Sequence, residues 1–143
     1  MMSRPRLLLA DDHLETVELL RALLESEFEV IGHVTDGRTL VRHACRLSPD
    51  VIVTDISMPE LDGLSAASEI LRRDPRARIV FVTVHADHGM VARGLEVGGL
   101  GFVLKMSAGD DLVPAVRAAL RHSLYISSTL HFEDERTAVR QSR

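Results

Sequence analysis

The sequence predicts an α/β fold, with a five-stranded parallel sheet that is doubly wound and covered by helices on both faces. Short apolar runs of strand length alternate strictly with segments whose apolar residues recur at helical spacing. This alternation is typical of parallel sheets. The runs are continuously apolar, as expected of strands buried on both faces. Because right-handed crossovers leave few topologies, we expect the flavodoxin-like strand order 2-1-3-4-5.

Five apolar runs are the predicted strands, and an apolar helical stripe follows each of them. The strands are residues 7–10, 28–34, 51–54, 79–84 and 101–104. The stripes of the first three helices are Leu14, Val17, Leu20 and Leu24; Leu40, Ala44 and Leu47; and Leu64, Ala67, Ile70 and Leu71. A weaker helix is predicted at about residues 87–97, and the last helix carries Leu112, Val116, Ala119 and Leu120.

The fourth and fifth predicted helices contain residues that disfavour helix. Gly89 and Gly94 lie in the fourth helix, and each costs about 1 kcal/mol relative to alanine in a helix interior. We therefore expect this helix to be mobile. Proline is tolerated only in the first turn of a helix, so Pro114 predicts that the fifth helix begins after Asp110.

Composition excludes several classes of protein. A chain of 143 residues fits one domain, and a net charge of −4 argues against a lone DNA-binding domain, which would usually be basic. The single cysteine, Cys45, allows neither an internal disulfide nor a zinc cluster and favours a cytoplasmic location. No apolar run approaches the roughly 18 residues of a membrane helix. We expect a domain at residues 1–122 and a charged tail or linker at 123–143.

Polar residues follow the carboxyl ends of four predicted strands. Asp11 and Asp12 follow the first strand, Asp55 the third and Lys105 the fifth, while Thr83 lies at the end of the fourth. The carboxyl ends of parallel strands meet at one edge, and the first and third strands flank the point where ligands bind in such sheets. The three carboxylates should therefore lie close together.

Three adjacent carboxylates need a proton or a cation between them, because each close pair repels by a few kcal/mol at an intermediate dielectric of about 20. An oxygen-only ligand set suits Mg²⁺. A carboxylate beside Mg²⁺ can attack a phosphoryl group to give an acyl phosphate. Lys105 and the hydroxyl of Thr83 could then bind the phosphoryl oxygens.

Taken singly, each of these residues has a simpler interpretation. Asp12 with Glu15 matches a helix capping box, Asp55 fits a loop, Lys105 a solvated cation and Thr83 ordinary strand filling. The seven histidines share no ligand spacing, so a histidine metal site is not expected. The joint placement of the acidic residues, the threonine and the lysine on one edge favours function.

The pattern resembles the receiver domain of bacterial response regulators, which has a CheY-like fold, over roughly residues 6–122. The matching residues are Asp11 and Asp12, Asp55, the segment 58–63 (MPELDG), Thr83 and Lys105. A multi-point match in the right order is far more specific than a single short motif. Segments 10–13 (ADDH) and 101–105 (GFVLK) look most like the NarL/LuxR-type subfamily, whose full-length members add a DNA-binding helix-turn-helix domain.

The resemblance implies a phosphoacceptor site with Mg²⁺ as cofactor. Asp55 would accept the phosphoryl group from a phosphohistidine of a sensor histidine kinase. Asp12, Asp55 and the backbone carbonyl of Ser57 would ligate Mg²⁺ directly, and Asp11 largely through water. Lys105 would bind the phosphoryl oxygens. Catalysis would be limited to self-dephosphorylation.

The resemblance also implies a switch. Thr83, which would bind a phosphoryl oxygen, and Phe102 look like the pair that couples phosphorylation to the face formed by the fourth helix, fifth strand and fifth helix. Core packing explains Phe102 equally well. The chain is then either a stand-alone receiver or a fragment of a transcription factor, and the linker-like tail after Ser123 favours the fragment. The output would be transcription, through a helix-turn-helix domain absent from these residues, with a possible homodimer on phosphorylation and no membrane partner.

Two other classes of protein fit the fold. A Mg²⁺-dependent aspartyl-phosphate phosphatase or phosphotransferase would use similar carboxylates, but it would normally need a general acid and a cap, and the sequence shows no insertion for a cap. A flavin or nucleotide binder would need a phosphate-cradling loop after the first strand. There Asp11 and Asp12 would repel phosphate unless a metal intervened.

Overall fold

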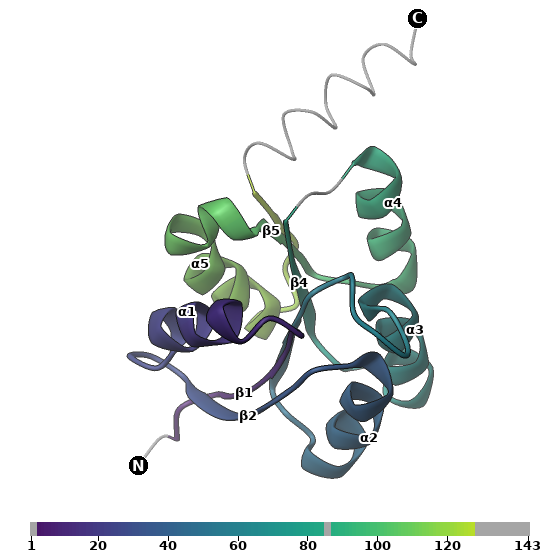
Figure 1. The fold of residues 1–143 in the computed structure, drawn as a ribbon, viewed down its shortest axis with the longest axis horizontal. Helices are drawn as coiled ribbons and strands as arrows, with labels where there is room; N and C mark the ends of the chain where they lie inside the picture. Colours follow the sequence, from purple (N-terminus) through teal and green to yellow (C-terminus); the bar gives the residue numbers. More distant parts are fainter. Residues whose placement is uncertain (1–2, 85–86, 128–143) are drawn as a thin grey trace, which may run out of the picture.

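Six parallel strands form one sheet in the order β2-β1-β3-β4-β5-β6 (Figure 1). The computed structural model describes residues 3–84 and 87–127. The strands are β1 Arg6–Ala10, β2 Glu29–Val34, β3 Val51–Thr54, β4 Ile79–Thr83, β5 Gly101–Leu104 and β6 Tyr125–Ile126. The predicted order of the first five strands is confirmed. Since β1 pairs with both β2 and β3, the strand order reverses beside β1.

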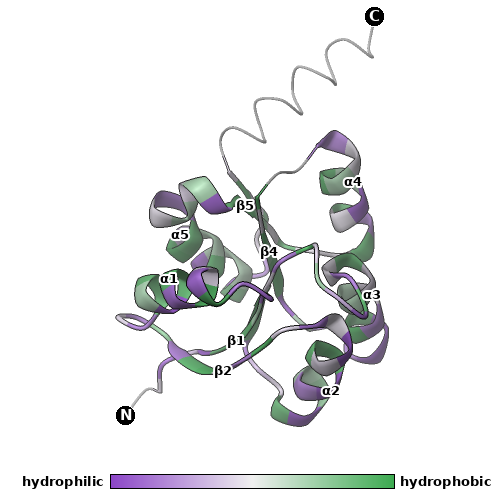
Figure 2. Ribbon diagram, in the orientation of Figure 1, coloured by the Kyte–Doolittle hydropathy of each residue, from purple (hydrophilic) through white to green (hydrophobic). Residues whose placement is uncertain are grey.

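Five helices cover the two faces of this sheet. They are α1 Leu14–Leu24, α2 Gly37–Leu47, α3 Gly63–Arg73, α4 His88–Val97 and α5 Ala108–Leu120. Helices α1 and α5 lie on one face and α2, α3 and α4 on the other (Figure 1). Hydrophobic residues concentrate on the strands and on the helix sides that face them (Figure 2). Alternate strand residues therefore feed two cores, with Leu7 and Leu9 on the α1/α5 side and Leu8 and Ala10 on the other.

The sixth strand was not predicted. Tyr125–Ile126 has only two residues and carries no apolar run that a periodicity argument could detect. Tertiary contacts hold it beside β5: the Tyr125 amide donates to the Leu100 carbonyl at 2.9 Å, and the Ser127 amide to that of Phe102 at 2.8 Å. The predicted tail at 123–143 thus contains strand residues, while its positions 128–143 lie outside the described residues.

The predicted start of α5 after Asp110 is wrong, because the helix begins at Ala108 with Pro114 in its interior. An interior proline costs about 3 kcal/mol, since it removes one backbone hydrogen bond and crowds the preceding turn. Burial offsets this cost: α5 places Leu112, Ala115 and Val116 in the core. Each fully buried Leu or Val contributes about 1.5–3 kcal/mol.

Helix α4 forms at the predicted place despite its two glycines. The side chain of Asp87 caps it by accepting from the Met90 amide at 2.8 Å. Packing explains one glycine, because a Cβ at Gly94 would clash with the Phe102 ring. The mobility of α4 stays a prediction, which amide exchange would test.

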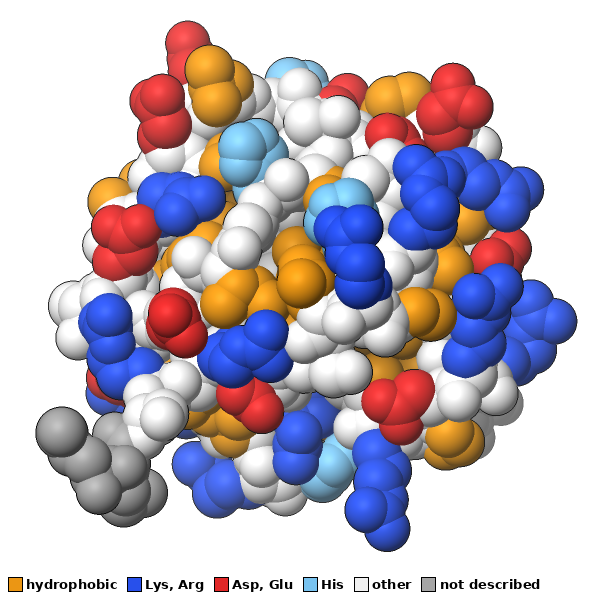
Figure 3. Space-filling view, turned by 90° about the horizontal axis from the view of Figure 1, so that it is seen from below, with side chains coloured by type: hydrophobic (Ala, Val, Ile, Leu, Met, Phe, Trp, Pro, Cys, Tyr) orange, Lys and Arg blue, Asp and Glu red, His pale blue; other side chains and the backbone are white. Residues whose placement is uncertain are grey.

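The surface of the described residues carries mixed charges. From below, basic and acidic side chains alternate with small hydrophobic areas, and the residues drawn on this face form no broad patch of one sign (Figure 3). Every described helix is too short or too polar to cross a lipid bilayer. Such a surface matches the mild net charge of −4.

Candidate functional site

The topology brings the ends of β1 and β3 together at the carboxyl edge of the sheet. The Asp55 amide donates to the Ala10 carbonyl at 2.8 Å, and the Asp11 amide donates to the Val34 carbonyl at 3.0 Å. These bonds continue the strand pairing past the last strand residues. They fix Asp11 and Asp55 next to each other, as the strand order predicted.

Asp55 is almost completely buried, with 4% of its surface exposed. Its Oδ1 accepts from the Ile56 amide at 2.7 Å, and its Oδ2 accepts from Lys105 Nζ at 3.0 Å. Burial raises the pKa of Asp55, since it disfavours the charged form, and the negative charge of Asp11 acts in the same direction. Lys105 and the Ile56 amide oppose this rise. The site thus holds a carboxylate whose charge depends on its neighbours.

Lys105 bridges the two buried carboxylates. Its Nζ lies 2.8 Å from Asp11 Oδ2 and 3.0 Å from Asp55 Oδ2. Burial alone would lower the pKa of Lys105, but the close contacts and negative charges of Asp11 and Asp55 outweigh it and raise the pKa. Lys105 is therefore charged at neutral pH and neutralises part of the cluster.

Asp12 does not cap helix α1, so the capping-box interpretation is wrong. The N-cap residue is His13, and no side chain caps the helix by a hydrogen bond. Asp12 keeps a partly exposed side chain whose Oδ1 lies 3.2 Å from His13 Nδ1. Its carboxylate is free of the helix and lies beside the other acids.

The acidic residues can share one metal ion. Ligand atoms of Asp11, Asp12, His13 and Asp55 all lie within 4.8 Å of one another. Asp11 Oδ2 is buried and has no hydrogen-bond partner; its contact with Lys105 Nζ, at 2.8 Å, is an ion pair outside hydrogen-bond geometry. A buried oxygen of this kind, in a mainly carboxylate set, fits a hard divalent cation such as Mg²⁺.

His13 is the member of this cluster that sequence reasoning missed. Its Nδ1 lies 3.3 Å from Asp11 Oδ1, and its amide donates to the same oxygen at 2.8 Å. Its position directly after Asp11 and Asp12 could have indicated that it belongs to the cluster, whereas the spacing of the histidines along the chain could not. Ser57, two residues after Asp55, places its amide 3.4 Å from Asp55 Oδ1.

Thr83 and Phe102 occupy neighbouring strands near this edge. Thr83 ends β4, is buried and pairs with Leu104 of β5. Phe102 of β5 is buried in the core on the face of the sheet that α2, α3 and α4 cover. Its ring centroid lies 5.4 Å from that of Phe81. Phe102 therefore packs in the core in this conformation, and the switch role of the pair remains a prediction.

Fold and site together define an α/β protein with a buried carboxylate–lysine cluster at the switch point of a flavodoxin-like sheet. A sequence model of the response regulator receiver domain matches residues 7–117. This match covers most of the chain, and the chain belongs to that family.

Several relatives are transcriptional regulatory proteins. LiaR of Bacillus subtilis is 41% identical over 117 residues, which are 80% of this chain and 55% of LiaR. YdfI of the same organism is 34% identical over 123 residues, with 85% and 57% covered. The chain thus spans about half the length of these curated relatives.

A solved structure gives the same picture of the fold. The crystal structure of a LuxR-family two-component response regulator from Aurantimonas sp. SI85-9A1 matches with a TM-score of 0.91 and 29% identity, covering 96% of this chain and 99% of that one. The predicted fold class and the resemblance to NarL/LuxR-type receivers are confirmed.

Proposed function

We propose that Asp55 accepts a phosphoryl group from the phosphohistidine of a sensor histidine kinase. The observation that carries this proposal is the Lys105 bridge between two buried carboxylates at the switch point of the sheet. A structural ion pair needs one acid and one base, whereas here one lysine faces two buried acids. These groups suit a site that takes up a further charged species.

The chemistry follows from the contacts of Asp55. A carboxylate oxygen attacks phosphorus and forms a new O–P bond, while the P–N bond to the kinase imidazole breaks and its electrons stay on the leaving nitrogen. Lys105 Nζ, already 3.0 Å from Asp55 Oδ2, is placed to pair with a phosphoryl oxygen. The Thr83 hydroxyl, at the end of β4, donates to another. Preorganised donors of this kind stabilise the charge of the transferring group.

The carboxylates would hold the Mg²⁺ that receiver domains use. Asp12, Asp55 and the Ser57 carbonyl are the proposed direct ligands, and Asp11 acts largely through water. When bound, the ion supplies positive charge that neutralises the carboxylates and the transferring phosphoryl group.

The proposed output is control of transcription, and the proposed location of the protein is the cytoplasm. Phosphorylation would shift a two-state equilibrium, through Thr83 and Phe102, at the face of α4, β5 and α5. DNA would be bound by a helix-turn-helix domain beyond these residues, and phosphorylation would favour a homodimer. Longer relatives that are named as transcriptional regulators, and of which the aligned part is about half, support this proposal.

Catalysis beyond self-dephosphorylation is not proposed. The described elements alternate strand and helix up to α5, and no inserted segment among them forms a cap over Asp55. Together with the family, this disfavours a phosphatase or phosphotransferase acting on small molecules.

Intact mass after incubation with acetyl phosphate and Mg²⁺ tests the proposal. We expect one added phosphoryl group that requires Mg²⁺ and disappears in Asp55→Asn. The matched control is Asp36→Asn, which changes an acid that caps α2 to a residue that caps equally well and should keep the adduct. An adduct that persists in Asp55→Asn overturns the choice of nucleophile. Failure of both the adduct and beryllofluoride binding overturns the phosphoacceptor role.

A further inference from the structure

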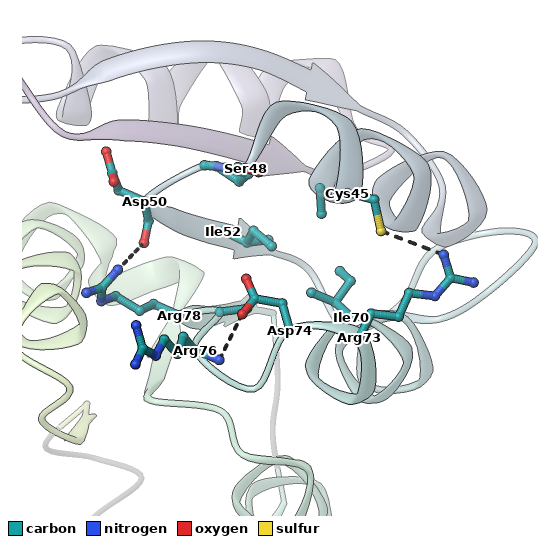
Figure 4. Close-up of a pocket in the computed structure, with 12 residues that line it drawn as sticks. Cys45, Ser48, Asp50, Ile52, Ile70, Arg73, Asp74, Arg76 and Arg78 are labelled. Carbon is teal, nitrogen blue, oxygen red and sulfur yellow. Dashed lines mark hydrogen bonds between the residues drawn. The ribbon is translucent and has the colours of Figure 1, made fainter.

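A cavity of about 390 Å³ opens at the edge of the sheet opposite Asp55 (Figure 4). It lies between the carboxyl ends of α2 and α3 and the first residues of β3 and β4. Small-molecule pockets typically measure about 300–1,000 Å³. The phosphoacceptor chemistry uses none of the residues that line this cavity.

The floor of the cavity is apolar. Ala44 of α2, Ile52 of β3 and Ile70 of α3 line it, and all three are buried in the same core. These side chains come from two helices and from the strand on which they pack, so the floor is preformed. A ligand that fits this floor has a non-polar body.

Three arginines surround this floor: Arg73, Arg76 and Arg78. Within residues 3–84 and 87–127, none of them forms an ion pair with a carboxylate. The two acids of the lining are engaged by backbone amides: Asp50 Oδ2 accepts from Arg6 at 2.7 Å, and Asp74 Oδ1 accepts from Arg76 at 3.0 Å. The lining therefore carries one net positive charge.

Arg78 has an unmet hydrogen-bonding need. Its Nη1 donates to the Asp50 carbonyl at 3.4 Å, but its Nε is buried without a partner. Arg78 is half-buried, and its guanidinium can pair with the two oxygens of a ligand carboxylate, a geometry that a guanidinium suits.

We propose that this cavity binds a small organic monocarboxylate, with its apolar body on the floor and its carboxylate at Arg78. One net positive charge complements one negative charge. A phosphate dianion fits less well, because Asp50 and Asp74 lie in the same lining and would repel its second charge.

Cys45 reports on occupancy of the cavity. It is the single cysteine of the chain, it is exposed, and its Sγ lies 3.7 Å from Arg73 Nη1 at the far end of the cavity from Arg78 (Figure 4). A ligand spanning the floor would shield this thiol. Alkylation of Cys45 by iodoacetamide, a neutral reagent, should therefore slow when the cavity is filled.

The test uses the full chain labelled with ¹⁵N and sodium octanoate as the probe. We expect saturable amide shifts at Cys45, Asp74 and Ala77, together with slower alkylation of Cys45. Octylammonium chloride, with the same body and the opposite charge, should produce neither effect.

Variants then locate the carboxylate. Arg78→Gln should weaken octanoate binding about tenfold, which corresponds to about 1.4 kcal/mol, because a charged hydrogen bond to the carboxylate is lost. Arg72→Gln, a neighbouring arginine of α3 outside the lining, should leave it unchanged. Arg78→Lys, which keeps the positive charge but loses the paired donors of the guanidinium, tests the same contact if Arg78→Gln does not fold.

Three outcomes overturn the proposal: no saturable shift, equal binding of octylammonium, or undiminished octanoate binding in a folded variant of Arg78. Octyl phosphate binding more tightly than octanoate overturns the preference for a monocarboxylate. Acetyl phosphate labelling of Asp55 is independent of all these results, so neither proposal depends on the other.

Discussion

Two carboxylate networks lie beside β5, and they differ in how their charge is met. At the carboxyl edge, Asp11 and Asp55 share the cation Lys105, and Asp11 Oδ2 keeps no hydrogen-bond partner. On the flank of the sheet, both oxygens of Asp111 accept from hydroxyls, of Tyr125 at 2.7 Å and of Ser127 at 2.8 Å.

The difference distinguishes a network that stabilises the fold from one that suits ligand binding. A fully satisfied network fixes one conformation, whereas an incompletely satisfied one holds free energy that a ligand can release. The Asp111 network ties β6 to α5, whereas the Lys105 network belongs to the site that we propose binds a metal ion and a phosphoryl group. The Leu104 amide links them, because it donates to Ser127 Oγ at 3.2 Å immediately before Lys105.

The largest expected effect comes from removing the shared cation. Lys105→Met should lower the free energy of unfolding by about 3–5 kcal/mol, because it leaves buried carboxylates unpaired. Urea unfolding at neutral pH measures this loss. Mg²⁺ should stabilise Lys105→Met more than the wild type. An equal Mg²⁺ effect in both would contradict the view that the carboxylates of this site lack compensating positive charge.

Breaking the satisfied network should have a smaller effect. Asp111→Ala leaves two hydroxyls without their acceptor, and we expect a loss of about 2 kcal/mol with faster amide exchange at Ser127. The control is Asp110→Ala, which also removes an acid from the first turn of α5 and should cost at most about 1 kcal/mol through the helix dipole. Equal losses of stability in the two variants would show that Asp111 acts only through the dipole of α5 and not through its hydrogen bonds to Tyr125 and Ser127.

Packing behind β5 supports both networks, and the two glycines of α4 test it. Gly94→Ala drives a Cβ against Phe102 and should destabilise by about 1–2 kcal/mol, since overpacking outweighs the gain in helix propensity. At Gly89 a Cβ would meet only Asp87 Oδ1, at 3.3 Å, so Gly89→Ala should stabilise by up to about 1 kcal/mol. The midpoint of thermal unfolding distinguishes the two variants. Equal shifts in this midpoint would show that the Phe102 ring moves aside without cost.

The smallest effect is a pH dependence at Tyr125. Its hydrogen bond to Asp111 raises the pKa of Tyr125 to about 12. The folded chain therefore keeps this proton after the unfolded chain has lost it, so stability should be full below about pH 10 and fall between about pH 10 and 12. Tyr125→Phe should lose about 1 kcal/mol at pH 8 and lack this tyrosine's contribution to the decline. An equally steep decline of stability in Tyr125→Phe would show that Tyr125 does not cause the pH dependence.

The sequence alone determined the sheet and its carboxyl edge. Continuous apolar runs marked the first five strands, and the topology then forced Asp11, Asp12, Asp55 and Lys105 onto one edge. Such an inference succeeds because strand periodicity is local and because parallel strands have only a few permitted connections.

Only the tertiary structure decided how the remaining groups are used. Tyr125–Ile126 is too short to signal a strand, and its partner Asp111 lies on another element. Pro114 lies inside α5 because the buried face of the helix outweighs local propensity. Contacts between distant segments set these outcomes, and their free energies exceed the roughly 1 kcal/mol differences on which most local rules rest.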